Sequence, residues 1–312
     1  MTVVLAQLGA QGAEQIAAAV PSVTVIDVPM HGEVPGEVKG DVLVVPSGYV
    51  DNLTEVLERG VQWVHEFGTG VDSVPLDLVF ADEGRVLTCS RGASAIPIAE
   101  WVLAQMLAFE KHLPEAWLHR APEHWNIGHG LGELHGKTVG LVGLGGIGTR
   151  VAELARAFGC RVVAARRTDA PSPLEGVQVG PLDEVLGVAQ HLVLAAPATA
   201  QTRHLLDESA FGRMPRGVHI VNVGRGSLID QDALRAALDD GAVARASLDV
   251  CTPEPLPDGH WLYEHPQVHL SPHISWSSPH GLERILQGFI ENLHRWEAGD
   301  ALHHVVDPHE RY

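Results

Sequence analysis

Three side chains suited to acid–base chemistry follow three strand-like segments late in the chain. Arg225 lies in the turn NVGRG, Glu254 lies in the stretch LDVCTPEP, and His273 lies in the stretch SPHISW. A guanidinium can hold a carboxylate, an imidazole can move a proton, and a carboxylate beside the imidazole favours its protonated form. Each residue alone has an ordinary explanation as part of a surface turn. Because carboxyl ends of parallel strands meet at one sheet edge, however, the sequence predicts a single site that combines them.

A glycine-rich turn near the middle of the chain predicts a dinucleotide site. The apolar segment 137–142 leads into GLGGIG, which spans Gly143, Gly145, Gly146, Ile147 and Gly148, and a helix-like segment follows at 149–158. The first glycine would make the tight turn, the second would admit a pyrophosphate, and the third would let the helix pack closely on the strand. Phosphate charge would then lie on the first N–H groups of the helix. The alternative is a turn that serves packing only.

The residues after the next strand-like segment indicate which dinucleotide binds. Sites for NAD place Asp or Glu there to accept hydrogen bonds from the ribose, whereas this chain has Arg166, Arg167 and Thr168. Two guanidinium groups and a hydroxyl suit a 2′-phosphate, so we expect NADP(H) to be preferred, with NAD(H) still possible. The alternative is an exposed basic turn in which Asp169 serves the ribose.

The elements that must position these groups alternate between strand and helix. Short β-branched runs in the first hundred residues predict one small parallel sheet, and a second set from residue 137 onward predicts another. A strongly apolar helix is expected over 98–111, and a last helix over about 279–298 returns to the first sheet. The fold class expected is α/β, with two Rossmann-like or flavodoxin-like domains. Residues 1–96 and 278–312 would form the substrate domain, and residues 97–277 the inserted dinucleotide domain.

Composition and charge narrow the classes of protein. The chain has 312 residues and a formal net charge of −18, so its surface should repel nucleic acid and anionic lipid. It shows neither a signal peptide nor an apolar run of membrane-spanning length. The three cysteines form neither a disulfide framework nor a CxxC pair, so we expect a cytoplasmic protein. His119, His124 and His129 are spaced five apart, which does not align them on one helix face, and no metal site is expected.

These stretches together resemble the D-isomer-specific 2-hydroxyacid dehydrogenase family over nearly the whole chain. The matching segments are GTGVD at 68–72, GKTVG at 136–140, the glycine turn, and the three stretches that carry Arg225, Glu254 and His273. The basic residues after the second strand and the closing VVDPHERY look similar to the glyoxylate/hydroxypyruvate reductase branch.

The resemblance implies a role for each matching residue. It implies that Arg225 binds the substrate carboxylate and carbonyl oxygen, that Glu254 pairs with His273, and that His273 moves the proton. Backbone N–H groups of Gly68, Thr69 and Gly70 would bind the substrate carboxylate from the other domain. Further residues expected along the cofactor are Pro197, Thr202, Val223, Gly224, Asp249, Ser275 and Trp276.

Some positions depart from the family pattern or extend it. Gly224 stands before Arg225 where Ala is common, and Trp276 stands where a small residue often lies, so the indole could narrow the substrate pocket. Arg91, in the loop SRGASAIPIAE, is a further hypothetical substrate contact, although a solvent-exposed turn is the simpler interpretation.

The function expected is an NAD(P)-dependent oxidoreductase that reduces small 2-keto acids, such as glyoxylate or hydroxypyruvate, to D-2-hydroxy acids. One alternative is an enzyme like D-3-phosphoglycerate dehydrogenase, although no C-terminal regulatory extension is seen. Another is a dinucleotide-sensing binding protein or corepressor on the same fold. Formate oxidation is disfavoured by Glu254, and phosphite oxidation by the absence of Lys at 69–70. The apolar helix from Ile98 and the residues around Trp117 and Trp125 suggest a homodimer.

Overall fold

The computed structural model describes residues 1–48, 50–117, 130–168, 170–310 and 312. His119, His124, His129, Trp125 and Asp169 therefore lie outside the described residues. The chain divides into two compact units, which are described separately below. Unit 1 comprises Met1–Ser94 with Ser278–Tyr312, and unit 2 comprises Ala95–Ser277.

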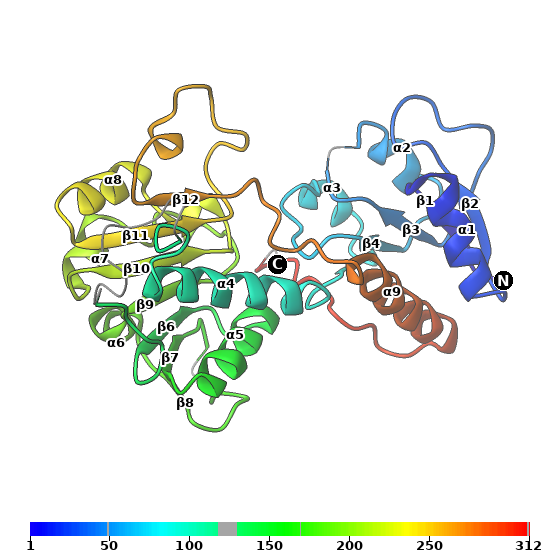
Figure 1. Ribbon diagram of the computed structural model, residues 1–312. Helices are drawn as coiled ribbons and strands as arrows, with labels where there is room; N and C mark the ends of the chain where they lie inside the picture. The colour runs from blue at the N-terminus through cyan, green and yellow to red at the C-terminus, as the bar shows by residue number, and fades with distance from the viewer. Residues whose placement is uncertain (49, 118–129, 169, 311) are drawn as a thin grey trace. The chain divides into compact units, whose positions relative to one another are not determined.

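Unit 1 is a five-stranded parallel sheet in the order β2-β1-β3-β4-β5 (Figure 1). Its strands are β1 (Val3–Ala6), β2 (Thr24–Asp27), β3 (Val42–Val45), β4 (Trp63–Glu66) and β5 (Val86–Cys89). Its helices are α1 (Gly9–Ala19), α2 (Leu53–Leu57), α3 (Leu76–Val79) and α9 (Gly281–Ala298). The C-terminal segment runs beside β5, where Thr88 and Val305 form an antiparallel bridge. Segments from both ends of the chain thus build one unit.

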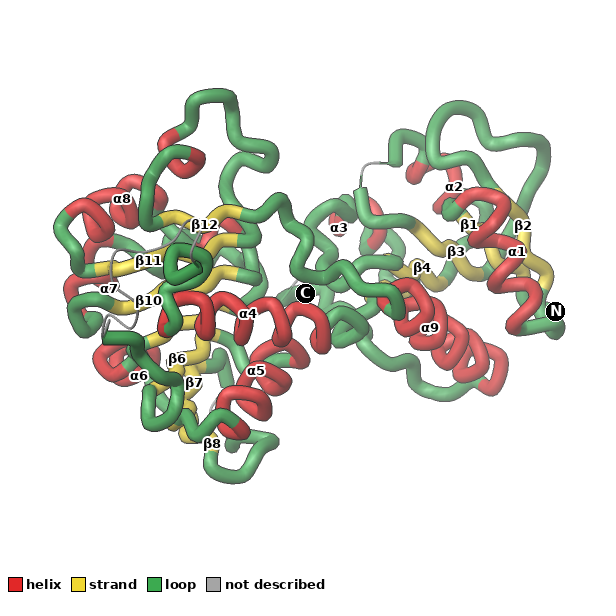
Figure 2. Tube along the Cα trace, in the orientation of Figure 1, coloured by secondary structure: helices red, strands yellow, loops and turns green. Residues whose placement is uncertain are grey.

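Unit 2 is a seven-stranded parallel sheet in the order β12-β11-β10-β9-β6-β7-β8, and Figure 2 shows its strands lying between helices. Its strands are β6 (Thr138–Val142), β7 (Arg161–Ala165), β8 (Val177–Val179), β9 (His191–Leu194), β10 (Val218–Asn222), β11 (Val243–Leu248) and β12 (Val268–Leu270). Its helices are α4 (Ala95–Glu110), α5 (Gly146–Ala157), α6 (Leu182–Val188), α7 (Glu208–Arg213) and α8 (Gln231–Asp239), with 3₁₀ turns η1 (Gly226–Leu228) and η2 (Trp261–Tyr263). The α/β class with two parallel sheets is confirmed.

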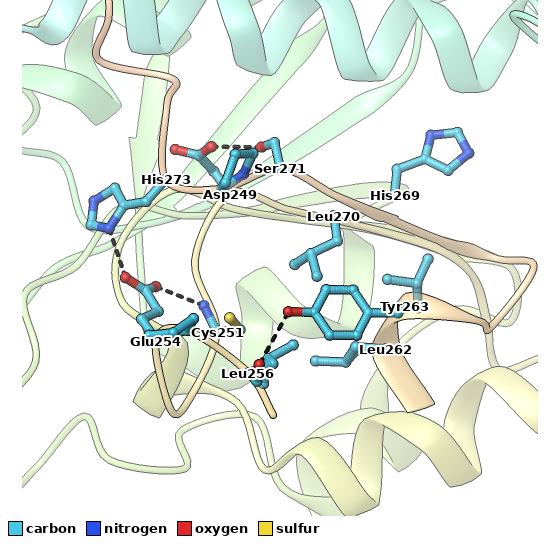
Figure 3. Close-up of a pocket in the computed structure, with 13 residues that line it drawn as sticks. Asp249, Cys251, Glu254, Leu256, Leu262, Tyr263, His269, Leu270, Ser271 and His273 are labelled. Carbon is cyan, nitrogen blue, oxygen red and sulfur yellow. Dashed lines mark hydrogen bonds and ion pairs between the residues drawn. The ribbon is translucent and has the colours of Figure 1, made fainter. Parts of the chain in front are cut away.

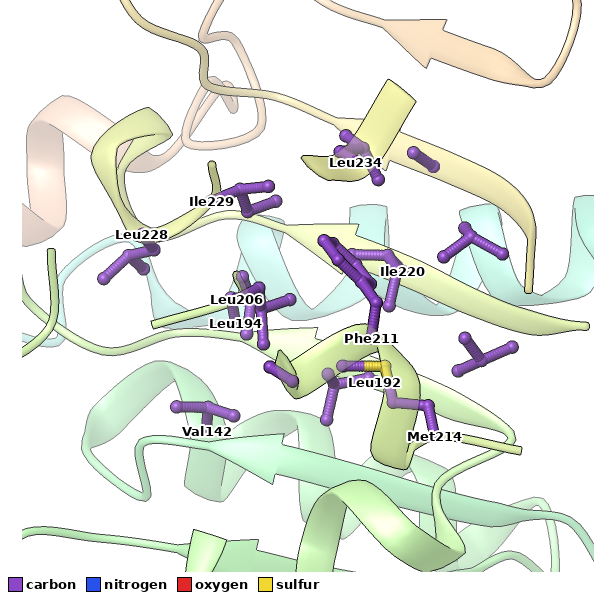
Figure 4. Close-up of a cluster of buried hydrophobic side chains, with 14 of the residues drawn as sticks. Val142, Leu192, Leu194, Leu206, Phe211, Met214, Ile220, Leu228, Ile229 and Leu234 are labelled. Atoms are coloured by element: carbon purple, nitrogen blue, oxygen red, sulfur yellow. The ribbon is translucent and has the colours of Figure 1, made fainter. Parts of the chain in front are cut away.

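Helical layers cover both faces of the unit 2 sheet, which explains why most of its strand residues are apolar. Alternate residues along a strand point to opposite faces. Leu192 and Leu194 accordingly pack in a core with Phe211 of α7 and Leu234 of α8, while the intervening Val193 packs in a second core with residues of α4 and α5 (Figure 4). The sheet is therefore held rigidly between two helical layers, and its carboxyl edge offers fixed positions for a site.

Helix α4 has a different environment from the one its composition suggested. Ile98, Val102, Leu103 and Met106 are all buried inside unit 2, so they are core residues and supply no surface for a second subunit. Trp117, in contrast, is 62% exposed.

A chain of buried polar groups crosses unit 2 between α4 and strands β9 to β11. His191 Nε2 lies 3.0 Å from Glu110 Oε1, His191 Nδ1 lies 3.1 Å from His219 Nδ1, and His219 Nε2 lies 2.9 Å from Ser247 Oγ. One assignment satisfies every group with both rings neutral: Ser247 donates to His219, His219 to His191, and His191 to the Glu110 carboxylate. Burial lowers the pKa of His219 well below its usual value, which agrees with a neutral ring.

Among the described residues, no group of three or more His, Cys, Asp and Glu side chains could hold a metal ion. Within the same residues, no helix has the length and apolar character needed to cross a bilayer.

Candidate active site

The turn between β6 and α5 has the shape that a dinucleotide needs. Gly143 has φ +99°, and a Cβ there would lie 2.8 Å from the Ala195 carbonyl oxygen. A Cβ on Gly148 would lie 2.1 Å from the Gly143 oxygen, so the close contact of helix and turn requires glycine. Beside Gly145, however, there is open space. The backbone N–H groups of Gly145, Gly146 and Ile147 find no acceptor among the described residues, which leaves them for phosphate oxygens.

The end of β7 carries the basic residues expected for the ribose side of the cofactor. Arg166 is half-buried, and its guanidinium donates to the Pro171 carbonyl oxygen at 3.3 Å. Arg167 and Thr168 are exposed. Within the described residues, no carboxylate directly follows the strand, which is the position that a ribose-binding acid would take.

The turn after β10 is fixed by a buried asparagine that sequence reasoning did not identify. The Asn222 side chain accepts a hydrogen bond from the Gly224 N–H at 3.0 Å and donates to the Arg225 carbonyl oxygen at 3.0 Å. A Cβ on Gly224 would lie 2.8 Å from the Ala196 oxygen, which accounts for glycine here. A Cβ on Gly226 would lie 2.1 Å from the Cys251 carbonyl group, so this turn packs directly on the turn after β11. The Arg225 guanidinium is half-buried and donates to the Gly224 oxygen at 2.8 Å.

The side chains of Glu254 and His273, which the family resemblance implied to be partners, lie within hydrogen-bond distance of each other. His273 Nδ1 lies 2.9 Å from Glu254 Oε2, and the two side chains point toward each other in Figure 3. The other carboxylate oxygen of Glu254 accepts the Cys251 N–H at 2.9 Å, which orients the carboxylate. Because Glu254 holds Nδ1–H, the Nε2 atom of His273 is left for a substrate oxygen.

The His273 turn is held by Asp249, which is 1% exposed at the end of β11. Its carboxylate accepts hydrogen bonds from the Ser271 hydroxyl at 2.6 Å and from the Ile274 and Ser275 N–H groups at 2.9 Å each. His273 itself has φ +53°, a conformation that non-glycine residues rarely adopt, and donates its backbone N–H to the backbone carbonyl oxygen of Asp249 at 2.9 Å. Asp249 thus fixes the backbone that presents the imidazole. Its expected place along the cofactor stays a prediction.

Trp276 also contacts this turn. Its indole N–H donates to the His273 carbonyl oxygen at 2.8 Å, while 49% of the residue is exposed. The indole therefore supports the His273 backbone and also presents an open face beside it.

A cavity of about 670 Å³ lies next to the Glu254–His273 pair and is lined in part by Leu262 and Tyr263 of η2 (Figure 3). Its walls include Glu254, His273, Cys251, Tyr263 and Leu270. Burial, and to a lesser degree Glu254, raises the pKa of the Cys251 thiol to about 11. The thiol therefore stays protonated near neutral pH and is a poor nucleophile.

The remaining cofactor residues expected in unit 2 lie in its strand-end turns. The Thr202 hydroxyl donates to the Pro197 carbonyl oxygen at 2.7 Å and accepts the Thr199 N–H at 2.7 Å, which closes the loop after β9. Val223 and Ser275 are buried in the turns that carry Arg225 and His273.

The expected substrate residues Gly68, Thr69, Gly70 and Arg91 belong to unit 1. The first three begin two residues after β4, and Arg91 is exposed two residues after β5. All four therefore lie at the carboxyl edge of the unit 1 sheet.

Comparison with known proteins assigns the chain to a family. The model of the D-isomer specific 2-hydroxyacid dehydrogenase NAD binding domain matches residues 103–275. The chain belongs to this family. The resemblance inferred from the sequence is thereby confirmed.

Curated relatives of this family member include two kinds of enzyme. The glyoxylate reductase of Korarchaeum cryptofilum (strain OPF8) is 31% identical over 252 residues, which cover 78% of this chain and 75% of the relative. The D-3-phosphoglycerate dehydrogenase of Bacillus subtilis (strain 168) is 35% identical over 214 residues, 68% of this chain but only 40% of the relative. The chain thus spans less than half the length of that dehydrogenase.

Solved structures of the family agree with the fold. A D-isomer specific 2-hydroxyacid dehydrogenase from Xanthobacter autotrophicus Py2, in complex with NADPH and MES, has a TM-score of 0.85 at 27% identity and covers 100% of this chain and 99% of its own. An NADPH-dependent glyoxylate/hydroxypyruvate reductase from Sinorhizobium meliloti, in complex with NADP and sulfate, has a TM-score of 0.81 at 26% identity and covers 100% of both chains.

Proposed function

We propose that this protein uses NADPH to reduce small 2-keto acids, with glyoxylate and hydroxypyruvate as the leading candidates, and that it gives the D-2-hydroxy acid where the product is chiral. The observation that carries the proposal is the 2.9 Å pair of Glu254 and His273, in the same unit as the dinucleotide turn and Arg225. An imidazole supported by a carboxylate is the proton donor that a carbonyl reduction requires.

In the proposed reaction, the glycine turn 143–148 and Arg166 would hold the dinucleotide, whose nicotinamide would supply the hydride for the keto carbon. Arg225 holds the substrate carboxylate and stabilises the negative charge that develops on the carbonyl oxygen. His273 Nε2 donates its proton to that oxygen, and the Glu254 carboxylate stabilises the imidazolium before the transfer. Reversing the same steps would make His273 the base in oxidation of the hydroxy acid.

A panel of keto acids tests this proposal. Glyoxylate, hydroxypyruvate, pyruvate and 3-phosphohydroxypyruvate would each be assayed with NADPH and with NADH by following absorbance at the nicotinamide band. We expect the highest kcat/KM for an unphosphorylated two- or three-carbon acid. A clear preference for the phosphorylated acid would instead support the phosphoglycerate reaction that the 35% identical relative's name suggests. Cofactor binding without turnover of any acid would support the dinucleotide-sensing alternative.

NADP preference is proposed from Arg166, Arg167 and Thr168. Removing the Arg166 guanidinium in Arg166→Ala should raise the KM for NADPH by about ten- to a hundredfold, because each charge-assisted contact to phosphate contributes about 1.5–3 kcal/mol. The KM for NADH should change little. Arg161→Ala, at the exposed start of the same strand β7, is the matched control. A wild-type preference for NADH would contradict the proposal.

We also propose a homodimer and a cytoplasmic location. The exposed Trp117 supports an interface, while the unpaired thiols of Cys89, Cys160 and Cys251 suit a reducing compartment. Light scattering during size-exclusion chromatography should give twice the 33.5 kDa chain mass, and a single-chain mass would contradict the dimer.

A further inference from the structure

A buried glutamate lies directly below the loop of unit 1 that we expect to bind the substrate carboxylate. Glu66, the last residue of β4, has no exposed surface. Its Oε1 atom accepts hydrogen bonds from the Ser47 hydroxyl at 2.9 Å and from the Gly68 N–H at 3.2 Å. Its Oε2 atom is buried and has no hydrogen-bond partner among the described residues. One oxygen is thus fixed to the loop, and the other is unsatisfied.

The contacts around Glu66 tie together the carboxyl ends of three neighbouring strands. Ser47 follows β3, Gly68 follows β4, and the Ser90 N–H after β5 donates to the Gly68 oxygen at 2.8 Å. A Cβ on Gly68 would lie 2.0 Å from Ser47 Oγ and 3.0 Å from Glu66 Oε1, so the loop rests on the carboxyl group with no spare room. A change in the charge or size of the Glu66 side chain must therefore alter the position of the loop.

The same loop presents backbone donors that nothing in its own unit uses. The N–H groups of Thr69 and Gly70, both half-buried, have no acceptor among the described residues. Adjacent unsatisfied N–H groups form a site for a carboxylate. This observation, independent of Glu66, suits the loop to an anionic ligand.

Few titratable groups face Glu66. Asp72 lies on the loop that follows Glu66. Cys89 lies at the end of β5, and Arg91 lies beside its thiol. After β3, Ser47 donates its hydroxyl to Glu66. The pKa of Glu66 is raised to about 7, because burial, with a smaller contribution from Asp72, outweighs the hydrogen bonds from Ser47 and Gly68, which lower it. The side chain is therefore close to half ionised at neutral pH.

We propose that Glu66 is a positioning residue whose ionisation controls the affinity of the adjacent loop for the keto-acid carboxylate. The uncharged carboxyl group leaves the Thr69 and Gly70 N–H groups to the substrate. The ionised form places a second negative charge against the one arriving, in a buried setting where like charges repel strongly. This inference rests on the proposed function and adds a regulator to the same site.

The KM for the keto acid is the quantity that should respond. With NADPH saturating and ionic strength constant, the KM for glyoxylate should rise about tenfold from pH 6 to pH 9, which corresponds to an increase of about one pKa unit in Glu66 when substrate binds. The KM for NADPH should not show this rise. The variant Glu66→Gln keeps the acceptor for Ser47 and Gly68 and cannot ionise. Its KM for glyoxylate should stay near the low-pH value of the wild type, with kcat within about twofold.

Two neighbouring substitutions should move the midpoint of the KM profile in opposite directions. Ser47→Ala removes a donor that stabilises the carboxylate, so the midpoint should move to higher pH. Asp72→Asn removes a repelling charge, so the midpoint should move to lower pH. A purely structural role for Glu66 would not produce opposite shifts, and this pair decides the question even if Glu66→Gln fails to fold.

The outcomes separate this inference from the function it rests on. Proton donation by His273 contributes equally to the wild type and to Glu66→Gln, so the difference between their profiles isolates Glu66. Turnover with identical KM profiles in the two proteins would overturn the inference and leave the proposed function intact. Absence of keto-acid turnover in the wild type would overturn the proposed function and the inference with it.

Discussion

At the scale of single residues, the proton donor is the part of the site that can be tested most directly. His273→Gln removes the proton that Nε2 donates, so kcat for glyoxylate reduction should fall about 10²- to 10⁴-fold. NADPH affinity should change little, because no step of cofactor binding uses this imidazole. His269→Gln is the matched control, since His269 lines the same cavity without contacting Glu254. Steady-state kinetics and NADPH fluorescence titration measure the two effects, and comparable losses in both variants would contradict the role of His273.

Trp276 should act through the backbone of His273. Trp276→Phe keeps an aromatic ring but removes the N–H that donates to the His273 oxygen at 2.8 Å. Loss of one hydrogen bond costs about 0.5–1.5 kcal/mol, so kcat should fall about two- to tenfold if the bond holds the imidazole in its reactive position. Trp261→Phe, in η2, is the control. If Trp276→Phe gained activity with a larger keto acid and kept the wild-type kcat for glyoxylate, the indole would only limit the size of the substrate pocket.

At the scale of elements, two glycines in the turn between β6 and α5 should have separate roles, one in cofactor binding and one in the stability of the fold. Gly145 has space for a Cβ and an extended backbone with φ −87°, so Gly145→Ala should unfold with nearly the wild-type midpoint but bind NADPH about tenfold or more weakly. Gly148→Ala would force a Cβ against the Gly143 oxygen and should lower stability by about 1–3 kcal/mol. Thermal unfolding and fluorescence titration of both variants measure these effects. Equal stability of the two variants would contradict the assignment of separate roles.

Much of this arrangement could be predicted from the sequence, because short runs rich in β-branched residues alternate with helix-like segments, and the later runs end in polar turns. The pairing of Glu254 with His273, 19 residues further on, was implied by the family resemblance, and the structure has His273 Nδ1 2.9 Å from Glu254 Oε2. The roles of Asn222, Asp249 and Glu66 could not be predicted, because each depends on hydrogen bonds to turns from neighbouring strands. Strand β8 has only three residues, too few for a recognisable pattern. Helix α4 was expected to offer apolar surface, but its length and composition fit burial against a sheet equally well.

For the whole molecule, two buried histidines should make stability depend on pH. Burial and, secondarily, His304 lower the pKa of His65 to about 3, and burial lowers the pKa of His219 well below its usual value. The unfolded chain binds these protons near pH 6.5 and the folded chain does not, so stability is fully present above about pH 6.5 and is lost as pH falls below it. His65 should contribute a loss of about 2 kcal/mol by pH 5, and His219 should contribute a loss in the same direction.

Denaturant unfolding at pH 7 and pH 5 tests this dependence, with hydrogen exchange in β4 and β10 reporting on units 1 and 2. His65→Gln should flatten the pH response of unit 1. His280→Gln, which removes an exposed imidazole, is the control and should leave the response unchanged. A wild-type protein whose units are as stable at pH 5 as at pH 7 would contradict the assignment of neutral buried rings.

The division of unit 1 between the two ends of the chain has a consequence for biosynthesis. The core of that unit includes Phe289 and Leu293 of α9, which pack with Trp63 of β4. On the ribosome, β1 to β5 emerge long before α9 is translated. The apolar sheet face that α9 covers in the folded protein therefore stays exposed to solvent during that interval. Unit 2 has no such delay, because all of its strands come from one continuous segment. Nascent chains should therefore acquire protease resistance first in the middle of the sequence, and the N-terminal segment should be the one that engages chaperones.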